Sequence, residues 1–172
     1  MNFNKLIMLR FLLFIFPLCT LLMSCTDKVY YPNYNYESRI VEIGKQGTLI
    51  VKAWGKGRSI DIAKENAKKN ALHDYIFKGF SSSNEINSSE LRPLLTNSDA
   101  EDKNKEYFIK FFKKDGIYLK FASFTDENGN IGINDRVKEG KDFKIGIIVV
   151  INKALLIKEL EDAGVKSKFG IN

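Results

Sequence analysis

Small residues spaced regularly over residues 51–71 constrain the fold more than any other feature of this chain. A mostly apolar, β-prone segment, residues 48–54, is followed by Gly55 and Gly57. Alanines then recur at four-residue steps: Ala63, Ala67 and Ala71. A four-residue step returns to the same face of a helix. Because alanine puts little side chain between backbones, this face allows a helix to lie close against a sheet.

These spacings predict a helix from about Ser59 to Phe77, with Ser59 as its N-cap and Gly79 after its end. We interpret the two preceding glycines as a tight strand-to-helix turn. Their spacing matches neither the dinucleotide-binding fingerprint nor the phosphate-loop motif, so the sequence predicts no nucleotide site. We expect His73 and Asp74 to form an exposed pair without a catalytic role.

The second half of the chain is predicted to complete a sheet. Two aromatic segments, residues 106–112 and 117–124, flank an Asp-Gly pair and are typical of a β-hairpin. The most hydrophobic stretch of this half, residues 143–151, predicts a central strand. Asn152 is expected to cap a short C-terminal helix over residues 153–163. The order of elements predicts an α+β two-layer sandwich, a small, mainly antiparallel sheet carrying one long helix and a short C-terminal helix.

Polar residues interrupt this pattern over residues 81–105, which we interpret as an insertion. A helical turn is expected near residues 89–95. The leucines of this turn are expected either to cover the main helix or to contact a partner: Leu91, Leu94 and Leu95.

The amino terminus has the layout of an export signal. Residues 1–10 carry two positive charges and no acid, and residues 11–23 are uncharged and mostly apolar. This run is shorter than the roughly 20 residues that span a bilayer core.

Residues 22–25 resemble the lipobox of bacterial lipoproteins, with Leu22 at position −3, Ser24 at −1 and Cys25 at the cleavage site. The resemblance implies a signal peptide of residues 1–24, cleaved between Ser24 and Cys25, and diacylation of the Cys25 thiol. Two or more acyl chains make a stable anchor. We therefore expect the protein in the bacterial outer membrane, anchored through lipid and facing the periplasm.

A tether, residues 25–40, is expected to connect the anchor to a single domain over residues 41–172. It holds four of the chain's seven tyrosines: Tyr30, Tyr31, Tyr34 and Tyr36. Two interpretations remain open. The rings either dock on a partner or on lipid headgroups, or they lie along the domain's own surface.

The chemistry-bearing residues are few. Cys19 lies in the predicted signal peptide and Cys25 is expected to carry lipid, while His73 is the single histidine, so the sequence predicts no metal site and no cofactor. Residues 126–130 begin like a calcium loop but lack its later glycine and glutamate. Loss of Lys5 and Arg10 with the signal lowers the net charge from +6 to +4, and no nucleic-acid motif accompanies this small excess. We expect a protein that is not an enzyme and binds no nucleic acid.

Residues 51–57, together with the alanines at positions 63, 67 and 71, resemble a pattern found in the amino-terminal domain of the flagellar T protein and in small outer-membrane lipoproteins first known from Helicobacter. The resemblance implies one helix packed on a small sheet, and an assembly or scaffold role beside an envelope protein partner. The alternative is a cell-wall or glycan-binding module, for example on peptidoglycan, that uses Trp54 and the tether tyrosines.

Overall fold

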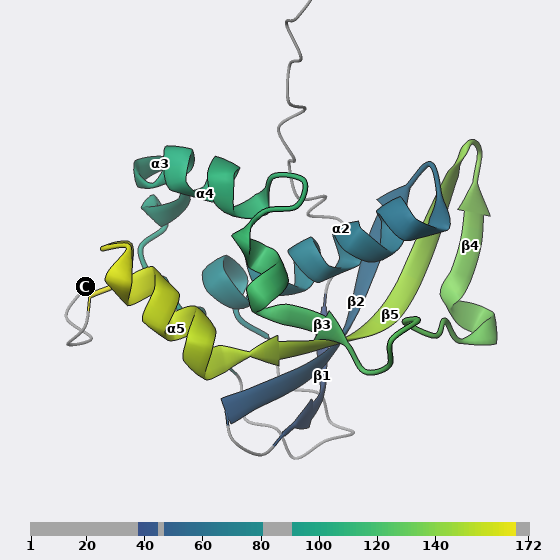
Figure 1. Ribbon diagram of the computed structural model, residues 1–172, viewed down its shortest axis with the longest axis horizontal. Coiled ribbons are helices and arrows are strands. Elements are labelled where there is room, and N and C mark those ends of the chain that lie inside the picture. The colour runs from purple at the N-terminus through teal and green to yellow at the C-terminus, as the bar shows by residue number, and fades with distance from the viewer. Residues whose placement is uncertain (1–37, 45–46, 81–90, 168–172) are drawn as a thin grey trace, which may run out of the picture.

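A computed structural model describes residues 38–44, 47–80 and 91–167 (Figure 1). The predicted signal peptide, the cleavage site at Ser24 and Cys25, and the four tether tyrosines lie outside these residues. The elements in chain order are β1 (Arg39–Ile43), β2 (Thr48–Gly57), α2 (Ile60–His73), a π-helical turn (Asp74–Lys78), α3 (Ala100–Lys103), α4 (Lys105–Phe112), a 3₁₀ turn (Ile117–Lys120), β3 (Ala122–Phe124), a 3₁₀ turn (Ile133–Asp135), β4 (Arg136–Glu139), β5 (Asp142–Asn152) and α5 (Lys153–Asp162).

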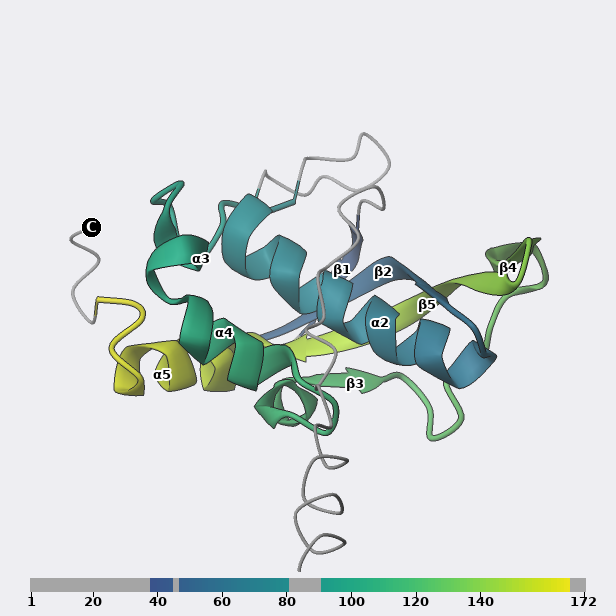
Figure 2. The ribbon, with the colours of Figure 1, turned by 90° about the horizontal axis from the view of Figure 1, so that it is seen from above.

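The strands form one antiparallel five-stranded sheet in the order β1-β2-β5-β3, and β4 pairs with the other end of β5. β2 and β5 pair along their whole length, with Val51 opposite Val149 and Trp54 opposite Gly146. The α2 helix lies along this pair of strands (Figures 1 and 2). The predicted α+β sandwich, its long helix, its central strand and its short C-terminal helix are confirmed.

The close approach of α2, and not a turn, requires glycine at the two positions in β2. A Cβ on Gly55 would lie 2.1 Å from the carbonyl oxygen of Ala63 and 2.3 Å from the amide nitrogen of Ala67. A Cβ on Gly57 would lie 2.7 Å from the Ala63 amide. Both glycines are strand residues, so the prediction of a tight turn was wrong. The backbone of α2 rests directly on the backbone of β2.

The ends of the helices follow the predicted signals. The Ser59 hydroxyl accepts a hydrogen bond from the Ile62 amide (3.2 Å), and Gly79 follows the π-helical turn with a φ of +73°. The Asn152 side chain accepts a hydrogen bond from the Leu155 amide (3.0 Å) at the start of α5. Gly164, with a φ of +71°, lies just beyond the end of α5.

The predicted hairpin is wrong. Its first strand is the helix α4, and its second is a 3₁₀ turn followed by the three-residue strand β3. Phenylalanines at helical spacing explain the difference, because Phe108, Phe111 and Phe112 are all buried on one side of α4. Asp115, with a φ of +54°, reverses the chain between α4 and the 3₁₀ turn. The Phe111 ring then stacks on that of Phe121 at 5.8 Å.

The leucines near residue 90 cover the main helix, as one of the two interpretations proposed. The amides of Leu94 and Leu95 donate to the carbonyls of Tyr75 (3.1 Å) and Ile76 (2.9 Å). Leu95 is buried. Residues 91–95 form no helical turn, so the part of that prediction that falls on them was wrong. These amides instead pair with carbonyls at the end of the long helix.

We predict that Gly55→Ala destabilises the domain by about 3 kcal/mol or more, because the new methyl group meets backbone atoms that cannot rotate away. Urea unfolding followed by circular dichroism measures this. Gly140→Ala is the control, since its Cβ would meet nothing within 4 Å although its φ is +63°. We expect that control to cost only about 1 kcal/mol. Equal costs for the two variants would contradict the close helix–strand contact.

Candidate functional site

The face of the sheet that α2 leaves uncovered is the first candidate surface, which we call the outer face. Side chains along β2 alternate, so Leu49, Val51 and Ala53 are buried against α2 while the residues between them are only partly buried. The strand register assigns these outward residues: Ile50, Lys52, Trp54 and Lys56 on β2, and Lys144, Gly146, Ile148 and Val150 on β5.

Trp54 lies at the centre of the outer face and is the single tryptophan of the chain. Its indole lies on the backbone of Gly146, where a Cβ would come within 2.9 Å of the ring carbons Cη2 and Cζ2. The ammonium groups of Lys52 and Lys144 lie 5.7 Å and 5.3 Å from the ring centroid. The absence of a side chain on Gly146 therefore leaves space for the indole, and the two lysines lie beside the ring.

Ion pairs position the charged groups around this ring. Lys52 pairs with Asp135, in the 3₁₀ turn before β4. Lys56 Nζ lies 3.0 Å from Glu139 Oε2 and 3.9 Å from Asp142 Oδ2. Basic and acidic residues are equally frequent here and at the neighbouring positions of β1: Arg39, Lys52, Lys56 and Lys144 against Glu42, Asp135, Glu139 and Asp142. The outer face is thus polar at its rim and close to neutral.

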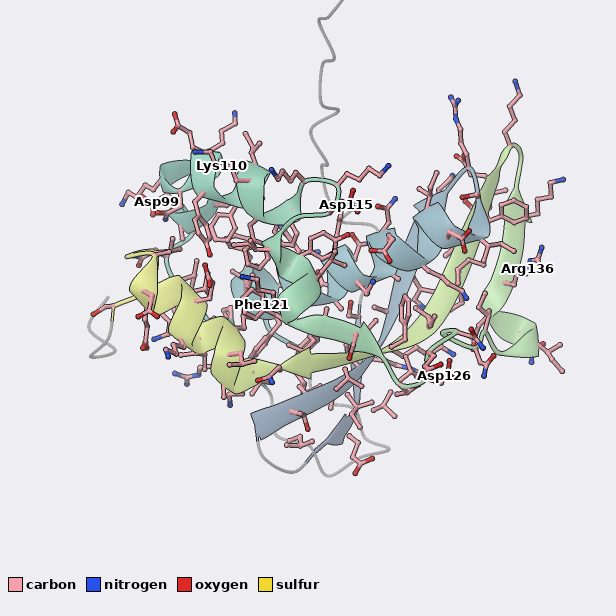
Figure 3. All side chains as sticks on the ribbon, in the orientation of Figure 1. Asp99, Lys110, Asp115, Phe121, Asp126 and Arg136 are labelled. Carbon is pink, nitrogen blue, oxygen red and sulfur yellow. The ribbon has the colours of Figure 1, made fainter. Side chains whose placement is uncertain are left out.

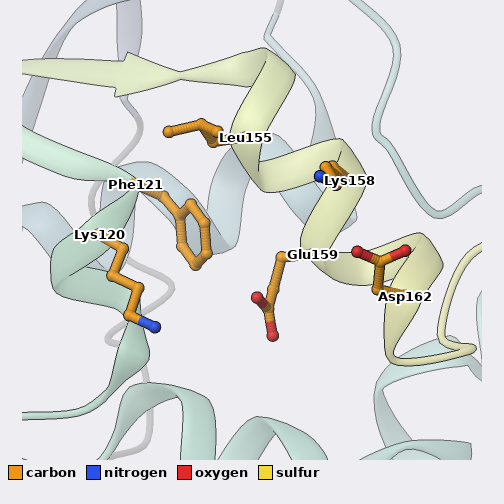
Figure 4. A pocket seen from close by; sticks show the side chains of 6 residues that line it. All are labelled: Lys120, Phe121, Leu155, Lys158, Glu159 and Asp162. Atoms are coloured by element: carbon orange, nitrogen blue, oxygen red, sulfur yellow. The ribbon is translucent and has the colours of Figure 1, made fainter.

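A groove of about 300 Å³ between the 3₁₀ turn before β3 and α5 is the second candidate surface (Figure 4). Its lining is Lys120, Phe121, Leu155, Lys158, Glu159 and Asp162. Phe121 is buried, whereas Leu155 is 50 % exposed. Burial raises the pKa of the nearby Tyr107, and the Glu159 carboxylate raises it further. The groove combines one apolar patch with both signs of charge.

Charged residues on the flank of α2 hold other elements in place. Lys68 Nζ lies 2.6 Å from one oxygen of Glu65, and the Tyr118 hydroxyl donates to the other at 2.8 Å. Lys69 Nζ lies 5.0 Å from the centroid of the Tyr118 ring. Burial lowers the pKa of Lys69. Together these contacts attach the 3₁₀ turn, which follows Asp115 in the side-chain view (Figure 3), to the long helix.

His73 and Asp74 are buried, with 1 % and 4 % of their surfaces exposed, so the predicted exposed pair was wrong. The Nε2 atom of His73 lies 3.3 Å from both carboxylate oxygens of Glu101 in α3. Asp74 accepts hydrogen bonds from the Ser38 amide (3.1 Å) and hydroxyl (2.7 Å), and Lys78 Nζ lies 3.1 Å from it. The pair therefore connects the long helix to α3 and to the residue before β1.

Among residues 38–44, 47–80 and 91–167, no cluster of three or more His, Cys, Asp or Glu side chains could hold a metal ion. Asp126 of the calcium-like segment instead accepts hydrogen bonds from the amides of Asn128 and Asn130, both at 3.1 Å. The same described ranges include no helix with the length and apolar character needed to cross a membrane.

Sequence reasoning named Trp54 but missed its setting. The signal was present in the alternation of lysine and apolar residues along β2, with a glycine near the middle of β5.

Comparison with protein-family models, curated proteins and solved structures finds no match to this chain. The resemblance carried by residues 51–71 stays a prediction.

We predict that His73 makes folding stability pH-dependent. Burial lowers its pKa in the folded protein, although Glu101 and Asp74 oppose that shift. As the pH falls through the ordinary value of about 6.5, the unfolded chain takes up the proton first, so the free energy of unfolding decreases.

Urea unfolding between about pH 7.5 and pH 5.5 tests this, because His73 titrates there in the unfolded chain. The variant His73→Gln should show a shallower loss of stability over the same range, whatever its stability at pH 7.5. Identical slopes for the two proteins would contradict a depressed pKa at His73.

Proposed function

We propose that this protein is a lipid-anchored interaction module of the bacterial envelope, without enzymatic activity, held in the outer membrane through Cys25 and facing the periplasm. The observation that carries the proposal is the lipobox-like segment at residues 22–25. It follows an uncharged run that begins after Lys5 and Arg10. A thiol at this position is the nucleophile that takes up a diacylglyceryl group.

The described domain supports a binding role. Its polar residues inside the fold serve as connectors: Glu65 holds the Tyr118 hydroxyl, Asp74 holds Ser38, and Glu101 faces His73. The outer face, in contrast, presents Trp54 with a rim of ion pairs on the side of the sheet away from α2. A module of this kind would meet an envelope partner through an exposed surface, either the outer face or the groove between the 3₁₀ turn and α5.

A second candidate function is binding to cell-wall glycan, for example peptidoglycan. The favouring observation is the place of Trp54, which lies on the backbone of Gly146 among charged side chains. Aromatic rings of this kind offer an apolar surface beside polar groups.

We predict that Cys25→Ser abolishes acylation and leaves residues 1–24 attached. Intact-mass spectrometry of the purified protein should show the natural chain starting at Cys25 and carrying diacylglyceryl and further acyl mass. Detergent-phase partitioning should then be lost in the variant, because two acyl chains supply the stable anchor. Cys19→Ser is the matched control. Because Cys19 lies within the predicted signal, this substitution should change neither the mass of the mature protein nor its partitioning. An unacylated natural protein would contradict the proposal.

Crosslinking in living cells tests the interaction role. A photo-reactive residue in place of Ser123, which lies opposite Val150 on the outer face, should capture a discrete envelope component. The same residue in place of Leu155 in the groove provides the comparison. A protein that stays uncrosslinked at both positions and migrates as a solitary monomer after mild extraction would count against an interaction module.

A further inference from the structure

We propose that the outer face is a glycan-binding platform, with Trp54 as its stacking ring and amino-sugar polymer of the cell wall as its ligand. This inference rests on the proposed function, because an envelope address places the domain beside such a polymer. It names the partner of the outer face, and it is carried by the setting of Trp54.

The indole packs on the backbone of the neighbouring strand, on the side of the sheet away from the core. Trp54 is outward-facing on β2, and Gly146 on β5 leaves the space that its ring occupies. The ring is partly exposed. A pyranose ring presents C–H groups on one face, and an indole is the side chain that offers the largest apolar surface to such a face. A ring already held against the backbone loses little freedom when a sugar stacks on it.

Groups that can form hydrogen bonds lie beside the ring, and most of them are ion-paired. Lys52 is held by Asp135, and Lys56 by Glu139 and Asp142. Lys144 lies 5.3 Å from the ring centroid. Sugar hydroxyl and acetamido groups both donate and accept hydrogen bonds, so a rim that holds ammonium and carboxylate groups together matches their edges.

The charge balance selects among polymers. Basic and acidic residues are equally frequent over this face and its rim, so no excess of positive charge faces the ligand. A nucleic acid or an anionic membrane surface requires such an excess. A polymer without dense negative charge does not, and this favours the glycan strand.

An apolar strip extends the platform along the strands. Ile148 lies two residues from Gly146 along β5, and Val150 lies opposite Ile50 one step further. At about 3.3 Å per residue, the strip from Gly146 to Val150 runs for about 13 Å. That length accommodates more than one sugar ring beside Trp54.

The fluorescence of Trp54 provides the test, because the chain has no other tryptophan. The full-length protein is purified in a polyoxyethylene detergent, which carries no sugar head group, and titrated with soluble oligomers of N-acetylglucosamine. We expect a saturable change in emission, larger for longer oligomers. In parallel, the protein is pelleted with purified peptidoglycan sacculi, where Trp54→Ala should lower the affinity about tenfold or more.

Two further variants separate binding from folding. Lys144→Ala removes one flanking ammonium group without touching the core and should weaken pelleting several-fold. Leu155→Ala, in the groove, should pellet like the natural protein. Circular dichroism checks that Trp54→Ala keeps its fold.

Several outcomes would overturn the inference. They are an emission spectrum unchanged by every oligomer, equal pelleting of the natural protein and Trp54→Ala, or an emission that changes with protein concentration alone, which would assign the face to a second copy. Acylation of Cys25 is measured separately and does not enter this assay. A failure here therefore leaves the anchored interaction module standing, and a failure of acylation leaves the binding result standing.

Discussion

The contact between the backbones of α2 and β2 is the constraint on which the rest of the domain depends. At the contact, Gly55 and Gly57 of the strand have no side chain, and Ala63 and Ala67 of the helix have only a methyl group. The two elements therefore approach more closely than larger residues would permit. Such an approach excludes water along the contact and gains dispersion energy over many atom pairs. The buried apolar residues of the long helix are alanines as far as Ala71, and larger ones begin at Leu72.

This geometry explains the second half of the core. Beyond Ala71 the long helix carries Leu72, Tyr75 and Ile76, all fully buried. They belong to the same core cluster as the phenylalanines of α4 and the buried leucines of α5. The stack of the Phe111 and Phe121 rings then connects the helical layer to the start of β3. The core between the long helix and the sheet is therefore thin where it consists of glycine and alanine. It is thicker where it contains aromatic rings.

The fold class could be predicted from the sequence because its decisive signals are local. A strand of β-branched residues, an alanine face, the caps Ser59 and Asn152, and glycines after helices each act within a few residues. The segment of α4 was mispredicted because Phe108, Phe111 and Phe112 lie among other apolar residues, so both a helical and an alternating pattern fit so short a run. Only packing against the long helix decides between them.

The candidate site was less accessible to sequence reasoning for the same physical reason. His73 and Asp74 looked exposed beside lysines, yet Glu101 and Ser38, each far away along the chain, provide their partners. Trp54 could be named, but its support by Gly146 depends on the register of β2 and β5, which no local signal specifies.

The two faces of the sheet therefore have separate requirements. Burial against α2 needs small and aliphatic residues on one side and supplies the stability. On the other side, the contact of Trp54 with Gly146 adds cross-strand packing, which for such pairs is worth about 0.2–1 kcal/mol. The proposed stacking of a sugar on this ring would give it a second role, on a face that no described helix covers.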